Sequence, residues 1–201
     1  MSLSLLHLSD IHATLAGPLH GRVDGLARLT ELRQQLTSAP VRIDAVIAPG
    51  DLIDRTSPEA MPAVLRALDQ VAEDLGAPLI PVLGNHDVPA FDRLSGPLAA
   101  GHRSLMLGPL RIIVLNSSSG SLDEPQLNWL RQELSHGSVP EWGSVVCLHH
   151  SPLASPVPAL RGKGLRNGHE LAEVLTGSDV RLILTGHYHH VQAGALASVP
   201  V

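Results

Sequence analysis

Cysteine, aromatic side chains and basic charge are all scarce in this chain of 201 residues. Cys147 is the only cysteine, so no disulfide can form within the chain, which fits a reducing cytosol. Two Trp, one Tyr and one Phe offer few platforms for base stacking. The net charge of -5 supplies no basic field that would attract DNA or RNA. We therefore do not expect nucleic acid to be a partner.

Apolar runs of membrane-spanning length are also missing from the sequence. The segment Met1–Leu8 is apolar, but it has no basic residues at its start and Asp10 follows it, which predicts a first strand rather than a signal peptide. These features predict a soluble, cytoplasmic protein without a membrane partner. At this length we expect a single domain, residues 1–201. The apolar stretch after Val191 stops at Val201, so we expect either a truncated form or a short member of a longer type.

Short apolar runs alternate with helical patterns in the first part of the chain. Nearly continuous runs are typical of strands buried on both faces, and we expect strands at Leu3–Leu8, Ile43–Ala48, Leu79–Leu83, Ile112–Leu115, Val145–Leu148 and Leu182–Leu184. Leucine and valine recur every three or four residues in helical patterns around 26–36 and 64–75. Helix starts are expected at Ser57, which precedes a proline, and at Asn167, which with Glu170 resembles a capping box. The alternation predicts an α/β fold with one or two layered sheets.

Polar side chains follow the ends of five of these strand-like runs. The five clusters are Asp10 and His12; Gly50, Asp51 and Asp54; Gly84, Asn85, His86 and Asp87; His149 and His150; and Gly186, His187 and His189. In α/β folds the loops at the carboxyl ends of strands meet at one crevice. Carboxylates, imidazoles and amide oxygens are ligands of divalent metal ions. One such cluster is common in a surface loop, but five at strand ends predict a metal site.

Several of these residues allow more than one interpretation. Asp51 has two oxygens and can bridge two cations, although a turn aspartate by itself is equally consistent. Asp54 either orients a neighbouring ligand or caps a turn. We expect Asn85 to offer its amide oxygen to a metal, while His86 faces the substrate with Asp87 available to hold the imidazole. Neighbours on a strand point in opposite directions, so only one of His149 and His150 is expected to bind a metal.

The order of these motifs resembles that of the calcineurin-like metallophosphoesterases. The motifs D-x-H, G-D-x-x-D, G-N-H-D, H-H and G-H-x-H are most similar to those of the bacterial class III cyclic-nucleotide phosphodiesterases, and the resemblance runs from Leu5 to about Val201. It implies a four-layer α/β/β/α sandwich with two divalent or trivalent ions (Fe, Mn, Zn or Co) at the strand carboxyl ends. By motif position, the first ion is bound by Asp10, His12, Asp51 and His189, and the second by Asp51, Asn85, His149 and His187. The aspartate-serine that usually follows the middle strand is Asn116-Ser117 in this chain.

The resemblance implies a hydrolase of small phosphodiesters, in particular cyclic nucleotides of the cAMP type. The hypothesis is that a hydroxide bridging two metal ions attacks phosphorus in line, while His86 protonates the leaving oxygen and Asp87 holds His86. Glycerophosphodiesters fit equally well. A phosphomonoesterase or pyrophosphohydrolase with the same metals is an alternative, as is a non-catalytic metal-binding scaffold. The oligomeric state stays open, with a homodimer as one alternative.

Overall fold

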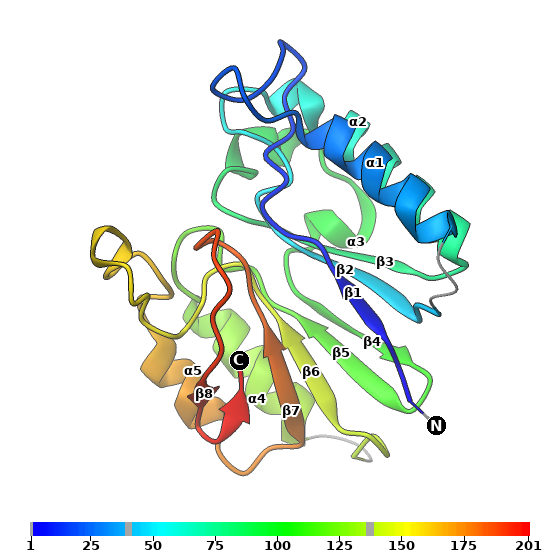
Figure 1. Ribbon diagram of the computed structural model, residues 1–201. Coiled ribbons are helices and arrows are strands. Elements are labelled where there is room, and N and C mark those ends of the chain that lie inside the picture. Colours follow the sequence, from blue (N-terminus) through cyan, green and yellow to red (C-terminus); the bar gives the residue numbers. More distant parts are fainter. Residues whose placement is uncertain (1, 39–41, 136–138) are drawn as a thin grey trace.

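Two β-sheets lie face to face, and helices cover the outer side of each sheet (Figure 1). The computed structural model describes residues 2–38, 42–135 and 139–201. Within these ranges, the first sheet consists of the parallel strands β1 (Leu5–His7), β2 (Ala45–Pro49) and β3 (Leu79–Val82), in that order. The second sheet has the order β4 (Arg103–Leu107), β5 (Leu110–Val114), β6 (Ser144–Cys147) and β7 (Val180–Leu184). Strand β4 is antiparallel to β5, and the other pairs are parallel.

The helices form the two outer layers. Helices α1 (Gly25–Ser38) and α2 (Met61–Leu75) pack on the first sheet, and α4 (Glu124–Ser135) and α5 (Gly168–Leu175) pack on the second. Shorter elements occupy the connections: η1 (Pro58–Ala60), η2 (Val88–Arg93), α3 (Gly96–Ala99) and η3 (Pro158–Leu160). A small hairpin of β8 (Ala195–Leu196) and β9 (Val199–Pro200) ends the chain beside β7. Among the described residues, no helix combines the length and apolarity needed to cross a membrane.

Alternating side chains of the strands serve two different cores. On β5, Ile112 and Val114 point into the layer between the sheets, whereas Ile113 points toward α4 and α5. On β2, Ile47 points between the sheets and Ala48 toward α1 and α2. Because both faces of these strands are buried, both sets of positions must be apolar, which is why the runs read as nearly continuous. The expected α/β/β/α sandwich is confirmed.

Strand β4 and the helix starts differ from the sequence-based expectation. No strand was expected at Arg103–Leu107, because this edge strand is only half buried and mixes polar with apolar side chains. The hydroxyl of Ser57 bonds to Glu59, and a 3₁₀ turn separates it from α2. The Asn167 side chain bonds to the backbone of Leu122 and to Glu170, so it makes no cap bond to its own helix. Both polar residues mark the predicted helix starts, but neither caps its helix as expected.

Candidate metal centre

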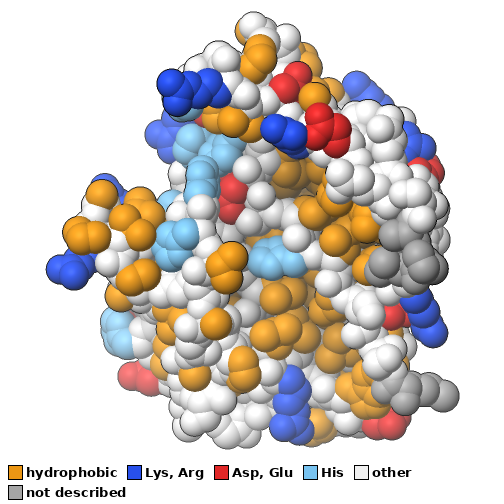
Figure 2. All heavy atoms as spheres, viewed as in Figure 1, with side chains coloured by type: hydrophobic (Ala, Val, Ile, Leu, Met, Phe, Trp, Pro, Cys, Tyr) orange, Lys and Arg blue, Asp and Glu red, His pale blue; other side chains and the backbone are white. Residues whose placement is uncertain are grey.

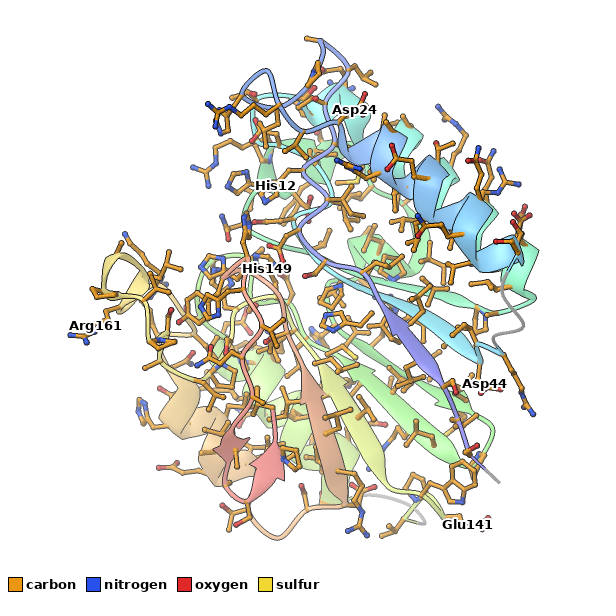
Figure 3. The ribbon with its side chains drawn as sticks, viewed as in Figure 1. His12, Asp24, Asp44, Glu141, His149 and Arg161 are labelled. Atoms are coloured by element: carbon orange, nitrogen blue, oxygen red, sulfur yellow. The ribbon has the colours of Figure 1, made fainter. Side chains whose placement is uncertain are left out.

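The five polar clusters converge at the carboxyl end of both sheets. Figure 3 shows His12, which follows β1, and His149, which follows β6, close together at this end of the sandwich. In the space-filling view, histidine side chains gather on the same face (Figure 2). Among the described residues, three groups of donors lie within 4.8 Å: Asp10, His12 and His189; His12, Asp51 and His86; and Asp51, His149 and His187. The clusters predicted from separate strands therefore form one site.

Asp51 lies between donors that come from the two sheets. Its Oδ2 is 3.2 Å from Nε2 of His149 and 3.7 Å from Nε2 of His12. Its Oδ1 accepts a hydrogen bond of 2.7 Å from the amide of His86. One carboxylate oxygen thus faces an imidazole of each donor set, which is the position that a bridging ligand requires.

Pairs of imidazole nitrogens also converge. Nε2 of His12 is 3.0 Å from Nε2 of His189, and Nε2 of His149 is 3.1 Å from Nδ1 of His187. Two ligands that are each about 2.1 Å from an ion and at right angles to each other are about 3.0 Å apart. The spacing of both pairs therefore matches two nitrogens directed at a common ion.

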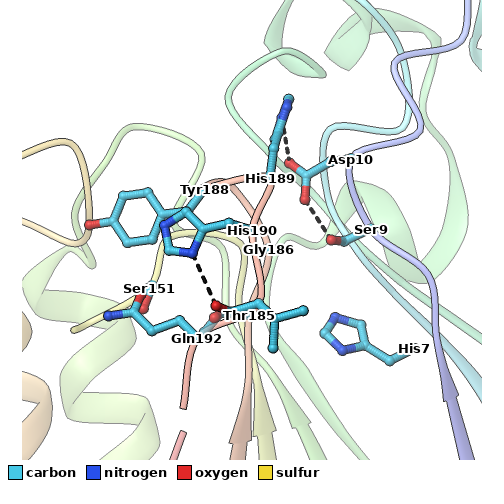
Figure 4. A pocket seen from close by; sticks show the side chains of 11 residues that line it. His7, Ser9, Asp10, Ser151, Thr185, Gly186, Tyr188, His189, His190 and Gln192 are labelled. Atoms are coloured by element: carbon cyan, nitrogen blue, oxygen red, sulfur yellow. Dashed lines mark hydrogen bonds and ion pairs between the residues drawn. The ribbon is translucent and has the colours of Figure 1, made fainter. Parts of the chain in front are cut away.

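Asp10 is held from both sides. Its Oδ1 is 3.3 Å from Nε2 of His189, and its Oδ2 accepts a 2.5 Å hydrogen bond from Ser9 (Figure 4). The amide of His187 donates to both oxygens. Burial alone would raise the pKa of Asp10, but the hydrogen bonds from His189 and Ser9 outweigh it and lower the pKa. The carboxylate is therefore kept ionised and oriented toward His189.

The same balance acts at the centre of the site. Burial alone would raise the pKa of Asp51, but the hydrogen bond and charge of His149 hold it well below its ordinary value. For His149, burial alone would lower the pKa, but its contact with Asp51 raises it. Nδ1 of His149 lies 2.8 Å from the carbonyl oxygen of Pro49, which fixes the ring so that Nε2 faces Asp51.

The backbone is strained at five of the seven predicted ligands. Asp10, His12, Asp51, His187 and His189 have φ between 48° and 79°, in the left-handed region that residues other than glycine rarely adopt. Such conformations cost about 1–3 kcal/mol each and are concentrated at functional sites. They turn each side chain sharply out of the strand direction and into the crevice.

Gly50 permits the close packing behind Asp51. A Cβ at this position would lie 2.7 Å from Nδ1 of His149 and 2.7 Å from the amide nitrogen of Gly84, and its φ is +85°. The loops that follow β2, β3 and β6 can approach one another only because this side chain is absent.

Asn85 provides a direct test of whether the residues fit a metal. Its Oδ1 is buried and has no hydrogen-bond partner among the described residues. Buried polar atoms without a hydrogen-bond partner are uncommon and destabilise the fold. A side-chain amide oxygen is a suitable ligand for a hard or borderline cation. With the buried carboxylates and the converging imidazoles, this atom completes a donor set that fits two divalent ions.

His149 and His150 have different environments. His149 is the member of the pair that contacts Asp51 and His187. Nδ1 of His150 lies 3.2 Å from the hydroxyl of Ser117, and its ring packs on His187 with 4.2 Å between centroids. Burial and the neighbouring charge of His149 lower the pKa of His150 to about 3. The geometry thus favours His149 as the ligand and gives His150 a supporting position behind His187.

The expectation that Asp87 holds His86 is wrong. Asp87 is fully buried, and its two oxygens accept hydrogen bonds from the amides of Ile53 (3.1 Å) and Gly84 (2.8 Å). Burial raises the pKa of Asp87 to about 7. These contacts join the loops after β2 and β3, so the carboxyl group supports the backbone of the site.

Asp54 is the carboxylate beside His86. Its Oδ2 lies 3.4 Å from Nδ1 of His86, while its Oδ1 accepts hydrogen bonds from the amide and hydroxyl of Thr56. The amide of Arg55 also approaches the same ring nitrogen at 3.4 Å. Both roles left open for Asp54 therefore apply, because it stabilises a turn and orients a neighbour. Its spacing of three residues from Asp51 was the only signal in the sequence.

A buried carboxylate shared by two sets of imidazoles, at the strand ends of an α/β/β/α sandwich, defines a dinuclear-metal hydrolase. Comparison with known proteins agrees with this class. The chain belongs to the calcineurin-like phosphoesterase family, whose model matches residues 3–191.

Curated relatives are similar over nearly the whole chain. A probable cyclic nucleotide phosphodiesterase from Rhodococcus erythropolis is 37% identical, over 98% of this chain and 68% of that protein. A cAMP/cGMP dual specificity phosphodiesterase from Mycobacterium tuberculosis is also 37% identical, over 98% of this chain and 65% of that protein. The chain thus spans about two thirds of the length of these relatives.

A solved structure supports the fold. The crystal structure of a dimetal phosphatase from Danio rerio matches with a TM-score of 0.71 and 17% identity, covering 98% of this chain and 85% of that one. At this identity the match concerns the fold alone.

Proposed function

We propose that this chain hydrolyses small phosphodiesters, with cyclic nucleotides as its substrates, by means of two metal ions. The observation that carries the proposal is the position of Asp51 Oδ2 between His12 and His149. The names of the curated relatives support the diester and cyclic-nucleotide class. The single cysteine leaves the fold independent of disulfides, which suits the cytoplasm that we propose as its compartment.

The proposed ligands divide into two sets that share Asp51. Asp10, His12 and His189 would complete the first set, and Asn85, His149 and His187 the second. This mixture of nitrogen and oxygen donors suits Fe, Mn, Zn or Co. When bound, the ions would supply an activated water and neutralise charge that develops on the phosphoryl oxygens.

His86 is the proposed proton donor to the leaving oxygen. Water adds to phosphorus and loses one proton to solvent, the bond from phosphorus to the leaving oxygen breaks, and that oxygen takes a proton from the imidazole, which solvent then protonates again. Asp54 and the Arg55 amide both lie against Nδ1 of His86, so Nε2 is the nitrogen that can reach the substrate. Asp54 would also stabilise the imidazolium form by its charge.

Electrostatics explain how an acidic chain can bind an anionic substrate. The net charge of the chain is -5. Two divalent ions bound against Asp10 and Asp51 would leave the centre at roughly +2, so the pocket would attract a phosphodiester although the surrounding protein does not. This attraction is local, which favours a small substrate over an extended polyanion.

A substrate panel tests the proposal. The Mn²⁺-loaded chain should hydrolyse 3′,5′-cyclic AMP and bis(p-nitrophenyl) phosphate, and it should hydrolyse p-nitrophenyl phosphate much less well. Asp51→Ala is the matched inactive variant, because it removes a ligand from both sets, and metal analysis should show that it loses bound metal. Preference for the monoester would replace the proposal with a phosphomonoesterase. No turnover of any of the three substrates would favour a non-catalytic scaffold.

A further inference from the structure

A hollow adjoins the metal centre on the side of His86. It has a volume of about 570 Å³ and lies between the loop that follows β1 and the loop that follows β2. Figure 1 shows these two loops, in blue and cyan, together at the same end of the molecule. Its volume is within the range of about 300–1,000 Å³ that is typical of small-molecule sites. His86, Asp54 and Arg55 form its boundary toward the metal centre.

Hydrogen bonds between and within the two loops shape this hollow. Ala13 and Ile53 form a parallel β-bridge between the loops, and the amide of Leu15 donates to the hydroxyl of Ser57. Within the first loop, the hydroxyl of Thr14 bonds to the carbonyl of Gly17, and Leu19 pairs with Val23. The walls are therefore formed before a ligand arrives, which reduces the entropy lost on binding.

One wall is apolar and the other is polar. Ala16, Pro18 and Leu19 line the first wall. On the second, the Arg55 side chain makes no hydrogen bond or ion pair with any other described residue. A guanidinium that is exposed to a hollow and not engaged by the protein can donate to the ring nitrogens and carbonyl oxygens of a base, or stack on it.

The charge of the lining distinguishes between two types of leaving group. The titratable and charged side chains of the lining are those of Asp54, Glu59, Arg55, His20 and His86, so two carboxylates face one permanently charged guanidinium and two imidazoles. This balance disfavours a second phosphate, which a pyrophosphate substrate would place there. It is compatible with a neutral group that has an apolar face and a hydrogen-bonding edge. A nucleoside has both.

We propose that this hollow binds the nucleoside of the substrate, the sugar and base whose hydroxyl oxygen leaves phosphorus. Arg55 is then a specificity-determining residue. The inference rests on the proposed function, because it is the position of His86 beside the leaving oxygen that assigns the hollow to the leaving group. The apolar wall of Ala16, Pro18 and Leu19 would cover one face of the base. Arg55 would contact its polar edge.

Arg55→Gln tests the inference, with Arg66→Gln on the exposed face of α2 as the matched control. We expect KM for 3′,5′-cyclic AMP to rise about tenfold in Arg55→Gln, the effect of losing one charge-assisted hydrogen bond, and kcat to fall by much less. Adenosine should inhibit the parent competitively, and its inhibition constant should rise by a similar factor. Arg66→Gln should match the parent in all three constants. Ala16→Trp, which fills the hollow from the apolar wall, should weaken adenosine binding in the same way.

Equal KM and equal adenosine inhibition in Arg55→Gln and Arg66→Gln would overturn the inference. Hydrolysis of bis(p-nitrophenyl) phosphate by the same preparations separates this result from a failure of the proposed function. If the parent hydrolyses no diester, the proposed function fails, and ligand-detected NMR of adenosine then tests the hollow alone. If adenosine binds Arg55→Gln and Ala16→Trp as strongly as it binds the parent, the hollow does not bind the nucleoside.

Discussion

At the scale of single residues, the centre depends on side chains with unusual surroundings. Asp51 keeps its charge although it is almost completely buried, because His149 and the amide of His86 compensate for the lost water. Asn85 has a buried oxygen without a hydrogen-bond partner among the residues that the structure describes. The oxygen of Asn85 is unfavourable without a cation, and a bound cation would stabilise both side chains further. The strained backbone at Asp10, His12 and Asp51 adds a further cost that metal binding offsets.

His86 can be tested separately from the metals. We expect His86→Ala to lower kcat for 3′,5′-cyclic AMP by about 10²- to 10⁴-fold, the usual contribution of a general acid. The loss should be smaller with bis(p-nitrophenyl) phosphate, because nitrophenolate leaves without needing a proton. Metal analysis should show the same occupancy in variant and parent. If His86→Ala has the same kcat as the parent on both substrates, His86 has no part in the mechanism.

Asp87 is expected to affect stability more than turnover. Asp87→Ala leaves the amides of Ile53 and Gly84 buried without partners, and each unpaired donor costs about 1–3 kcal/mol. Urea denaturation should therefore show a loss of about 2 kcal/mol or more. The kcat of the folded fraction should fall much less than in His86→Ala. A large loss of kcat at parental stability would restore a direct role for Asp87 in the reaction.

At the scale of elements, the second sheet is fastened at the end opposite the metal centre. Arg111 on β5 donates to Ser144 on β6, to the carbonyl of Glu133 at the end of α4, and to Asp179 just before β7. The side chains of Arg111 and Asp179 are only 9% and 6% exposed. This network links three strands and a helix through one guanidinium, so it fixes how the strands that carry His149 and His187 are aligned.

Removing one partner of this network should be costly. Asp179→Ala leaves the buried guanidinium of Arg111 with only the longer ion pair to Glu133, whose Oε1 is 3.7 Å from Nη1, and we expect a loss of about 3 kcal/mol in urea denaturation. Asp74→Ala is the control, because the side chains of the ion pair between Arg33 on α1 and Asp74 on α2 are 39% and 28% exposed, so solvent screens the pair and its loss should cost much less. Equal losses in the two variants would show that the network has no special structural role.

The sequence predicts the buried elements better than the exposed ones. Strands β2, β5 and β6 are buried on both faces and mostly apolar, so their positions could be read directly from the sequence. Strand β4 could not, because an edge strand with mixed side chains has no distinct pattern. The same limit applies to the site. Residue type and position at a strand end were enough to indicate Asp10, Asp51 and His187. The partner of His86 depends on how a turn folds, and adjacency favoured Asp87 where the structure has Asp54.

At the scale of the whole molecule, the metal centre joins the two sheets. Asp51 follows a strand of the first sheet and His149 a strand of the second, and they meet at 3.2 Å. Away from this end, the sheets are held together by the apolar side chains between them. Bound ions would therefore act as a cross-link between the two halves of the sandwich.

Metal removal should lower the thermal stability of the whole chain. A metal ion at a free concentration of about 100 times its Kd stabilises the folded state by about 2.7 kcal/mol. For a chain of this size, that raises Tm by at least about 5 °C. Calorimetry with EDTA should show that decrease, and addition of Mn²⁺ should reverse it. A Tm that is independent of both would mean that the donors hold no ion.

Anomalous X-ray diffraction from crystals of the Mn²⁺-loaded chain tests the central claim most directly. The account predicts two anomalous peaks at the carboxyl ends of the sheets, one beside Asp10, His12 and His189, the other beside Asn85, His149 and His187, with Asp51 between them. A single peak, or two peaks that do not share Asp51, would contradict it.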